Sequence, residues 1–283
     1  MEVQKLKIST KDGYKLAAIL REPNEKRKGV IQIHGGIGLP QELYSNFAIY
    51  LTQNGYATVT FDYRGIGKSK PTNLKGFDAD IIDWAELDMT GVFDWIIKKY
   101  PNDKKIVIAH SIGGALAGLM ENNSKIDQLF LIASSTAYWK DMSKPYRWIM
   151  PPVWSFFIPV HTFIFGYVKS KKFKLGEDIP KGVALKWWKW SKTKNYFEDD
   201  LKKSAKLLRY DQIKIPLTSI QISDDPIANN LTSNKLLAYY KKAKIKVCEI
   251  TPKELGVTKI GHVGFFSRKF KNTLWKDLII EME

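Results

Sequence analysis

Cysteine is nearly absent from this chain, since Cys248 is the only one among 283 residues. A single cysteine excludes an internal disulfide bond, so the fold must be held together by a packed core. Cys248 lies in an alternating stretch with Ile245, Val247 and Ile250, and we therefore expect its side chain in the core. This cysteine usage is compatible with a reducing, cytoplasmic setting.

Acidic residues are scarce relative to basic ones: 29 Asp and Glu stand against 45 Lys and Arg, a formal net charge of +16. The lysines are spread along the whole chain, which favours an evenly basic, solvated surface. Attraction to an anionic membrane surface or to an acidic ligand is the alternative that this charge leaves open. Neither a zinc-finger spacing nor an RNA-binding aromatic motif is present, so we expect no nucleic-acid partner.

A long uninterrupted apolar run is also missing. Residues 1–10 contain no apolar segment of the kind that a secretory signal needs, so we predict a cytoplasmic protein. Residues 148–168 are nearly uncharged and approach the roughly 20 residues of a membrane span. Pro151, Pro152 and Pro159 interrupt this run, which also lies between predicted strands of one sheet. We expect it to cover the sheet rather than to cross a membrane, with peripheral membrane contact left open.

Short runs rich in β-branched residues alternate with helical patterns along most of the chain. Strands are predicted at residues 3–9, 14–20, 29–34, 56–61, 105–109, 128–133, 216–222 and 245–250. Helices are predicted at residues 41–53, 81–100, 112–121, 231–242 and near 267–282. This alternation predicts an α/β fold with a mostly parallel central sheet and helices on both faces. The opening hairpin adds antiparallel strands at one edge.

The α/β alternation stops after residue 135 and resumes near residue 211. Residues 138–190 hold six of the nine tryptophans and are interrupted by five prolines. We predict a core formed by residues 1–135 and 211–283, and an inserted aromatic-rich cap, or lid, formed by residues 136–210. An apolar cap over the active-site edge shapes a pocket for acyl or aryl groups. The residues that we expect to line this pocket are Ile37, Trp154, Trp187 and Trp188, with ordinary packing inside the cap as the alternative for the tryptophans.

Ser111 follows the strand predicted at residues 105–109 and stands among small residues, in the sequence AHSIGG that begins at Ala109. A buried strand that turns sharply into a helix lifts one side chain into an exposed position where it can act as a nucleophile. The usual pattern of this turn is G-x-S-x-G, and Ala109 replaces its first glycine. Alanine still allows close packing, so we predict Ser111 as the nucleophile.

A serine nucleophile needs a general base, which is itself oriented by a carboxylate. The chain has only four histidines, and His262 lies in the loop after the last predicted strand. From that loop a base can reach across the carboxyl edge of the sheet. Asp224 and Asp225 follow the strand at residues 216–222. We choose Asp225, which directly precedes a proline, as the acid, and an exchange of roles with Asp224 stays open.

The oxyanion of acyl transfer has to be held by preorganised backbone N–H groups. Ile112, at the start of the helix after Ser111, supplies one of them. The glycine-rich loop after residue 34 can supply the other. We choose Gly36, because glycine lets the backbone approach a substrate closely.

Together these motifs resemble the α/β-hydrolase family, and the resemblance runs from the first hairpin to the C-terminus. The residues that carry it are the H-G-G loop from His34, the D-x-R-G-x-G-x-S turn from Asp62, the H-S-x-G-G elbow from His110, Asp225-Pro226 and Gly261-His262. The chain looks most like bacterial predicted hydrolases related to monoglyceride lipases and serine-aminopeptidase-like proteins, on residues 260–266, residues 273–275 and the pair Trp187 and Trp190. This resemblance implies the α/β-hydrolase fold and the triad order Ser111, Asp225, His262, but identifies no substrate.

These residues predict a metal-independent serine hydrolase that cleaves a carboxylic ester with a hydrophobic acyl group through an acyl-enzyme. Thioesterase, amidase or peptidase activity and acyl transfer on the same triad are the alternatives within this class. A non-catalytic ligand-binding or membrane-associated module is the alternative from another class. We expect a small-molecule ester as partner and no cofactor, and the sequence indicates no oligomeric state.

Overall fold

Eight strands form the central sheet of the computed structural model, which describes residues 1–283. Their order across the sheet is β1-β2-β4-β3-β5-β6-β9-β10. The strands are β1 Glu2–Ser9, β2 Lys15–Glu22, β3 Gly29–His34, β4 Tyr56–Phe61, β5 Lys105–His110, β6 Gln128–Ile132, β9 Pro216–Ile222 and β10 Lys244–Ile250. β2 pairs antiparallel with β1 and β4, and every other neighbouring pair is parallel. The predicted α/β fold, with its opening hairpin at one edge, is confirmed.

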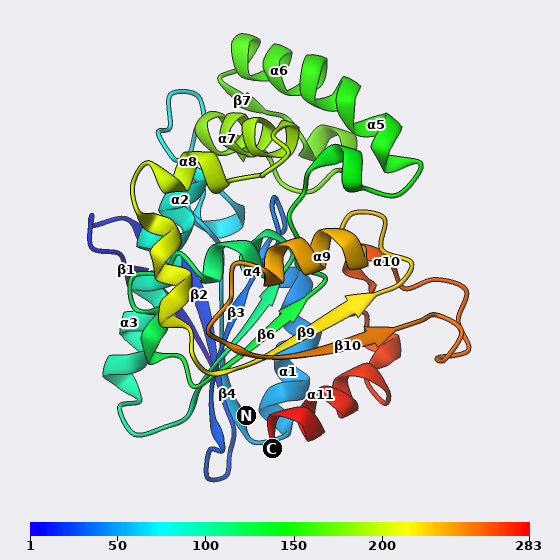
Figure 1. Ribbon diagram of the computed structural model, residues 1–283. Coiled ribbons are helices and arrows are strands. Elements are labelled where there is room, and N and C mark those ends of the chain that lie inside the picture. Colours follow the sequence, from blue (N-terminus) through cyan, green and yellow to red (C-terminus); the bar gives the residue numbers. More distant parts are fainter.

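The central strands are buried along their whole length because helices cover both of their faces. Every residue of β3, β4 and β5 is buried. In β5, Ile106 and Ile108 join the core under α1 (Ser45–Gln53) and α11 (Leu274–Met282). Val107 and Ala109 face the opposite core, under α3 (Thr90–Lys99), α4 (Ile112–Ala117) and α9 (Asn230–Leu237). Figure 1 shows these helices on both sides of the sheet.

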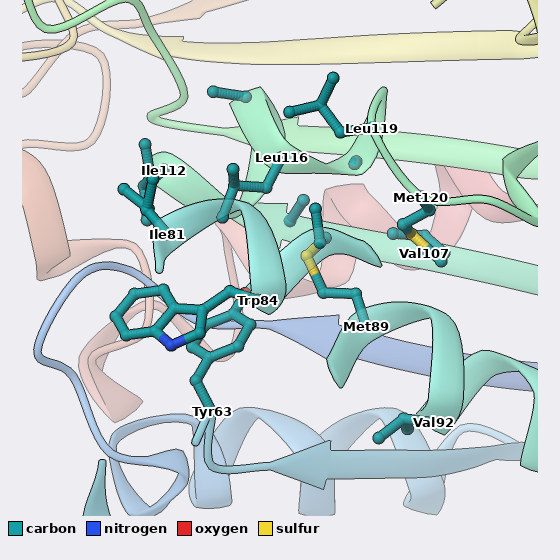
Figure 2. Packing of buried hydrophobic residues seen from close by; sticks show 14 of the residues in the cluster. Tyr63, Ile81, Trp84, Met89, Val92, Val107, Ile112, Leu116, Leu119 and Met120 are labelled. Carbon is teal, nitrogen blue, oxygen red and sulfur yellow. The ribbon is translucent and has the colours of Figure 1, made fainter. Parts of the chain in front are cut away.

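The helix predicted at residues 81–100 is one helical run with a π-helical segment in its middle. It begins with α2 (Ile81–Asp83), continues as the π-helical Trp84–Met89 and ends with α3. The ring of Trp84 stacks on Tyr63, with centroids 4.5 Å apart (Figure 2). Asp88 is fully buried and accepts hydrogen bonds from the backbone N–H (2.8 Å) and Nε (2.7 Å) of Arg64. The segment therefore fixes the turn that follows β4.

Residues 136–210, called the insertion from here on, connect β6 with β9 and lie above the sheet in Figure 1. The elements of the insertion are α5 Tyr146–Pro152, α6 Ile158–Ile164, β7 Tyr167–Val168, β8 Ile179–Pro180, α7 Lys181–Lys192 and α8 Glu198–Lys202. A π-helical segment, Val153–Phe157, joins α5 to α6. None of the helices is both long enough and apolar enough to cross a membrane.

Several helix limits and the position of one side chain differ from the sequence-based expectations. α9 ends at Leu237 and not at residue 242, and α11 begins at Leu274 and not near residue 267. α4 ends at Ala117 and not at residue 121, because the ring of Tyr210 packs against Gly118 and the side chain of Asn123 bonds the Gly118 carbonyl at 2.9 Å. Cys248 is half-buried, so the expectation of a core position is wrong. Its strand, β10, lies at the edge of the sheet, and most of its side chains are exposed.

Candidate active site

Ser111 lies at the sharp turn between β5 and α4, as its small neighbours predicted. Its backbone has φ 55° and ψ −124°, a strained conformation for a residue with a side chain. Gly113 and Gly114 make the turn possible, because a Cβ atom would lie 2.9 Å from the Gly35 carbonyl oxygen or 2.3 Å from the Ser134 hydroxyl. Ala109 is fully buried in β5, where its methyl group fits in place of the usual glycine.

Ser111, His262 and Asp225 form a continuous series of hydrogen bonds. The Ser111 hydroxyl lies 2.8 Å from His262 Nε2, and His262 Nδ1 lies 2.7 Å from Asp225 Oδ2. Because an ionised carboxylate only accepts, Nδ1 carries the proton and Nε2 is left to accept from the serine. His262 sits in the short helix α10 (Gly261–Gly264), after β10 as expected. His262 Nε2 is thus placed within hydrogen-bond distance of the Ser111 hydroxyl, on the side of the ring away from Asp225.

The two neighbouring aspartates make different contacts. Asp225 is buried, and its Oδ1 accepts from the N–H groups of Ile227 (2.8 Å) and Ala228 (2.9 Å). Burial raises the pKa of Asp225, but the hydrogen bond and charge of His262, together with these two N–H groups, leave that pKa below its usual value. Asp225 therefore remains ionised beside the imidazole.

Asp224 does not touch the imidazole. Its carboxylate accepts from the N–H groups of Ile260 (3.0 Å) and Gly261 (2.9 Å). Asp224 thereby holds the loop that carries His262. Of the two assignments that the sequence left open, this geometry fits Asp225 as the residue that orients the base.

In the glycine-rich loop after β3, the backbone N–H group that we chose for the oxyanion already has a hydrogen-bond acceptor. The N–H of Gly36 donates to the hydroxyl of Tyr44 at 2.8 Å, so it is engaged away from Ser111. The next N–H, of Ile37, makes no hydrogen bond within the chain. The N–H of Ile112 is the first of α4 and belongs to the groups without an intrahelical acceptor. The N–H groups of Ile37 and Ile112 thus have no acceptor within the chain, whereas that of Gly36, which we chose, is bonded to Tyr44.

Tyr44 and His110 connect the parts of the site through a buried network. The Tyr44 hydroxyl, which accepts from Gly36, donates to His110 Nδ1 at 2.8 Å, and His110 Nε2 donates to the His262 carbonyl at 2.9 Å. Burial, with the nearby His262, lowers the pKa of His110 to about 3, so its ring is neutral. The network ties the glycine-rich loop after β3 to the segment that carries His262. Sequence reasoning missed Tyr44, since nothing local distinguishes it from other aromatic residues of the core.

The other two histidines make no hydrogen bond with Ser111, His262 or Asp225. His34 is fully buried with neither ring nitrogen hydrogen-bonded, and burial lowers its pKa to about 3. His161 in α6 bonds the Phe157 carbonyl at 2.7 Å. No group of three or more His, Cys, Asp and Glu side chains lies close enough to hold a metal ion.

A cavity of about 450 Å³ opens above Ser111 and His262, between the sheet edge and the insertion. Nineteen of its 23 lining residues are hydrophobic, and the other four are Ser111, Ser135, Ser170 and His262. No charged side chain lines it. The cavity is therefore suited to an apolar group bound next to the serine.

Ile37 and Trp187 line this cavity, whereas Trp154 and Trp188 do not. Trp154 is buried behind Trp187, with the two rings edge to face and 6.1 Å apart. Trp188 lies one residue further along α7 and points to a groove on the other side of that helix, beside Phe163. A helix turns successive side chains by about 100°, which separates Trp187 from Trp188.

The fold is that of the α/β-hydrolases. The model of the family described as serine aminopeptidase, S33, matches residues 24–252, and the chain belongs to this family. Two curated relatives carry the same description, an uncharacterized 31.7 kDa protein in the traX-finO intergenic region of Escherichia coli. They are 34% identical over 93 residues, which are 30% of this chain and only 32% of their own length.

Several solved structures share the fold over the whole chain. A soluble variant of monoglyceride lipase from Saccharomyces cerevisiae has a TM-score of 0.72 at 16% identity, covering 100% of this chain and 96% of its own. A thermostable carboxyl esterase from Bacillus coagulans has 0.60 at 16%, covering 100% and 98%. The esterase Pf2001 from Pyrococcus furiosus has 0.59 at 16%, covering 100% and 91%. The chain is thus an α/β-hydrolase that resembles esterases and lipases.

Proposed function

We propose that this protein is a serine hydrolase that cleaves a carboxylic ester with a hydrophobic acyl group. The proposal is carried by one observation: the hydrogen-bonded series from Ser111 through His262 to Asp225 opens onto an uncharged, apolar cavity. Nucleophile, base and orienting acid at these distances are what acyl transfer requires.

In the proposed reaction, His262 Nε2 takes the hydroxyl proton as Ser111 Oγ attacks the ester carbonyl carbon. The oxyanion that forms is held by the N–H groups of Ile37 and Ile112, which have no other acceptor. Asp225 stabilises the imidazolium. His262 then gives its proton to the leaving alcohol, which departs. Water attacks the acyl-enzyme in the same way, and the carboxylic acid and free Ser111 result.

The cavity lining favours an ester over a peptide substrate. An aminopeptidase has to neutralise a free α-ammonium group, and the lining residues include no aspartate or glutamate for that purpose. An acyl chain needs only apolar contacts, which 19 lining residues provide. The carboxyl esterase and the monoglyceride lipase with the same fold are consistent with this choice.

We further propose that the insertion is a lid on a core formed by residues 1–135 and 211–283. Its residues Tyr146, Met150, Phe157, Trp187 and Tyr196 form much of the apolar wall above Ser111. Excluding water from the site strengthens the interactions that stabilise the oxyanion.

A fluorophosphonate probe, which reacts with activated serines, tests the proposal. We expect the native protein to be labelled, Ser111→Ala to be unlabelled, and kcat for p-nitrophenyl butyrate to fall by about 10⁴-fold or more in that variant. Ser135→Ala is the matched control, because Ser135 also lines the cavity but has no base beside it. Absence of labelling in the native protein, or equal labelling of Ser111→Ala, would refute the mechanism.

Substrates that differ only in their leaving group distinguish an esterase from a thioesterase or an amidase. With one acyl chain presented as an oxygen ester, a thioester and an anilide, we expect the highest kcat/KM for the oxygen ester. A higher value for the thioester or the anilide would assign the protein to thioesterases or amidases. Acyl-ester product in the presence of a second alcohol would indicate acyl transfer.

A further inference from the structure

The outer side of the insertion carries an unusual set of exposed apolar side chains. Phe163 is 90% exposed and Phe156 70%, on the helices that lie furthest from the sheet in Figure 1. Eight of the chain's 17 exposed large hydrophobic residues fall within residues 148–175. These eight form what we call the outer face: Trp148, Ile149, Phe156, Val160, Phe163, Ile164, Phe173 and Leu175. Isolated apolar residues on a surface are ordinary, but a concentration of this kind marks an interaction site.

Basic residues flank the residues of the outer face along the chain. Residues 144–192 contain ten Lys and Arg and two Asp and Glu, an excess of eight and thus half of the chain's net charge of +16. No acidic residue occurs in residues 142–176. The ammonium of Lys144 lies 4.8 Å from the ring centroid of Trp148, and that of Lys169 lies 3.6 Å from the ring of Phe165. Lysines that cover aromatic rings in this way keep their charge at the rim of an apolar surface.

The outer face is continuous with the cavity that holds Ser111. Ile149 and Leu175 are 49% and 63% exposed, and both also line that cavity. The cavity therefore borders the outer face, and an apolar molecule seated there has direct access to the site. A partner that is merely attracted by charge would not require this continuity.

We propose that the outer face docks on the surface of an anionic lipid bilayer, so that ester substrates pass from the bilayer into the cavity. The apolar side chains would enter the boundary between headgroups and acyl chains while the flanking lysines contact anionic headgroups. A second copy of the chain is a poor occupant, because face-to-face contact would bring together two copies of residues 142–176, a segment with six Lys and Arg and no Asp or Glu. Substrate entry rests on the proposed function, whereas docking does not.

Vesicle flotation of the full chain tests docking, with phosphatidylcholine alone and with phosphatidylcholine mixed with phosphatidylglycerol. The variant is F156S with F163S, and the matched control is L208S with I280S, which removes residues 66% and 63% exposed elsewhere. We expect native protein, control and Ser111→Ala to bind the anionic vesicles, with binding weakened by salt. We expect F156S/F163S to lose binding by about tenfold or more.

Hydrolysis completes the test. F156S/F163S should cleave dissolved p-nitrophenyl butyrate at the native rate, but should cleave a long-chain ester presented in anionic vesicles about tenfold more slowly. Equal binding by F156S/F163S and native protein, or equal binding to both kinds of vesicle, overturns the docking proposal. So does a native dimer in solution that this variant dissociates. Vesicle binding without fluorophosphonate labelling would instead refute the proposed function and leave docking intact.

Discussion

The floor and the roof of the cavity are built in different ways. The floor consists of strand ends and turns, where both side-chain oxygens of Asp225 and both ring nitrogens of His262 are hydrogen-bonded. The roof is the insertion, whose residues at the cavity are all hydrophobic apart from Ser170. A connected polar network has one favourable arrangement, whereas apolar packing tolerates substitution. The floor is thus suited to fix the reaction and the roof to select the substrate.

The largest expected effect separates the two aspartates of the floor. Asp225→Asn should lower kcat by about 10⁴-fold, because the amide donates to Nδ1 and stabilises the wrong tautomer of His262. Asp224→Asn should lower kcat by less than about tenfold, since it weakens only the bonds to Ile260 and Gly261. Steady-state kinetics on p-nitrophenyl butyrate measure both. The reverse order of effects would make Asp224 the orienting acid.

The next effect concerns the roof. Ala184 in α7 is buried and lines the cavity, so Ala184→Leu should fill part of the space for an acyl chain. We expect kcat/KM to fall by about 10- to 100-fold for p-nitrophenyl laurate and to change little for the butyrate. Trp188→Phe is the control, because Trp188 faces away from the cavity. Equal losses for both esters in Ala184→Leu would contradict selection by the roof.

A smaller effect is expected from the network that joins the glycine-rich loop after β3 to the segment that carries His262. Tyr44→Phe leaves the Gly36 N–H and His110 Nδ1 buried without a partner, which should lower the free energy of unfolding by about 2–5 kcal/mol. Because Tyr44 is a positioning residue, kcat should fall by about tenfold with KM unchanged. Denaturant unfolding and kinetics on both esters measure this. If the decrease in kcat differed between the butyrate and the laurate ester, Tyr44 would instead act on the pocket for the acyl chain.

The smallest effect is acid sensitivity of the floor. Burial lowers the pKa of His34 and His110 from 6.5 to about 3, so between these values the unfolded chain binds protons that the folded chain does not. The contribution of each neutral histidine to the free energy of unfolding is therefore fully present above pH 6.5. It decreases as the pH drops, by about 2 kcal/mol per histidine at pH 5.

His34→Leu isolates one of these contributions. Neither ring nitrogen of His34 has a partner, so leucine loses no hydrogen bond and removes one titrating group. The variant should show a decrease in unfolding free energy between pH 7 and pH 5 that is smaller by about 2 kcal/mol than in the native protein. An unchanged decrease would mean that His34 is accessible to protons in the folded state.

Local sequence patterns were sufficient for the strands and for the order of the site residues. β3, β4 and β9 have the predicted bounds because they are short runs rich in β-branched and other apolar residues. Ser111 and His262 could be chosen as candidates because the elbow and the loop that carry them are short, local motifs. The helix limits were less accurate: α4 ends where Tyr210, 92 positions beyond Gly118, packs against it.

What the sequence could not provide depends on contacts between distant segments. The Gly36 N–H is hydrogen-bonded because the side chain of Tyr44, eight residues later in the chain, lies beside it. The half-burial of Cys248 depends on β10 being an edge strand, which its own alternating residues do not reveal. Which of Trp187 and Trp188 faces the cavity depends on how α7 packs against the rest of the chain.

The connection of the insertion to the sheet has a consequence for how such proteins diversify. β6 and β9 are neighbours and pair in parallel, so the 133–215 segment leaves and re-enters the sheet at adjacent strands. Its length contributes only weakly to the entropy of closing that connection. A cassette of different size or composition can therefore be exchanged at this junction while the strand pairing remains unchanged. The β6–β9 junction is accordingly the natural point for transplanting the insertion of another hydrolase into this chain.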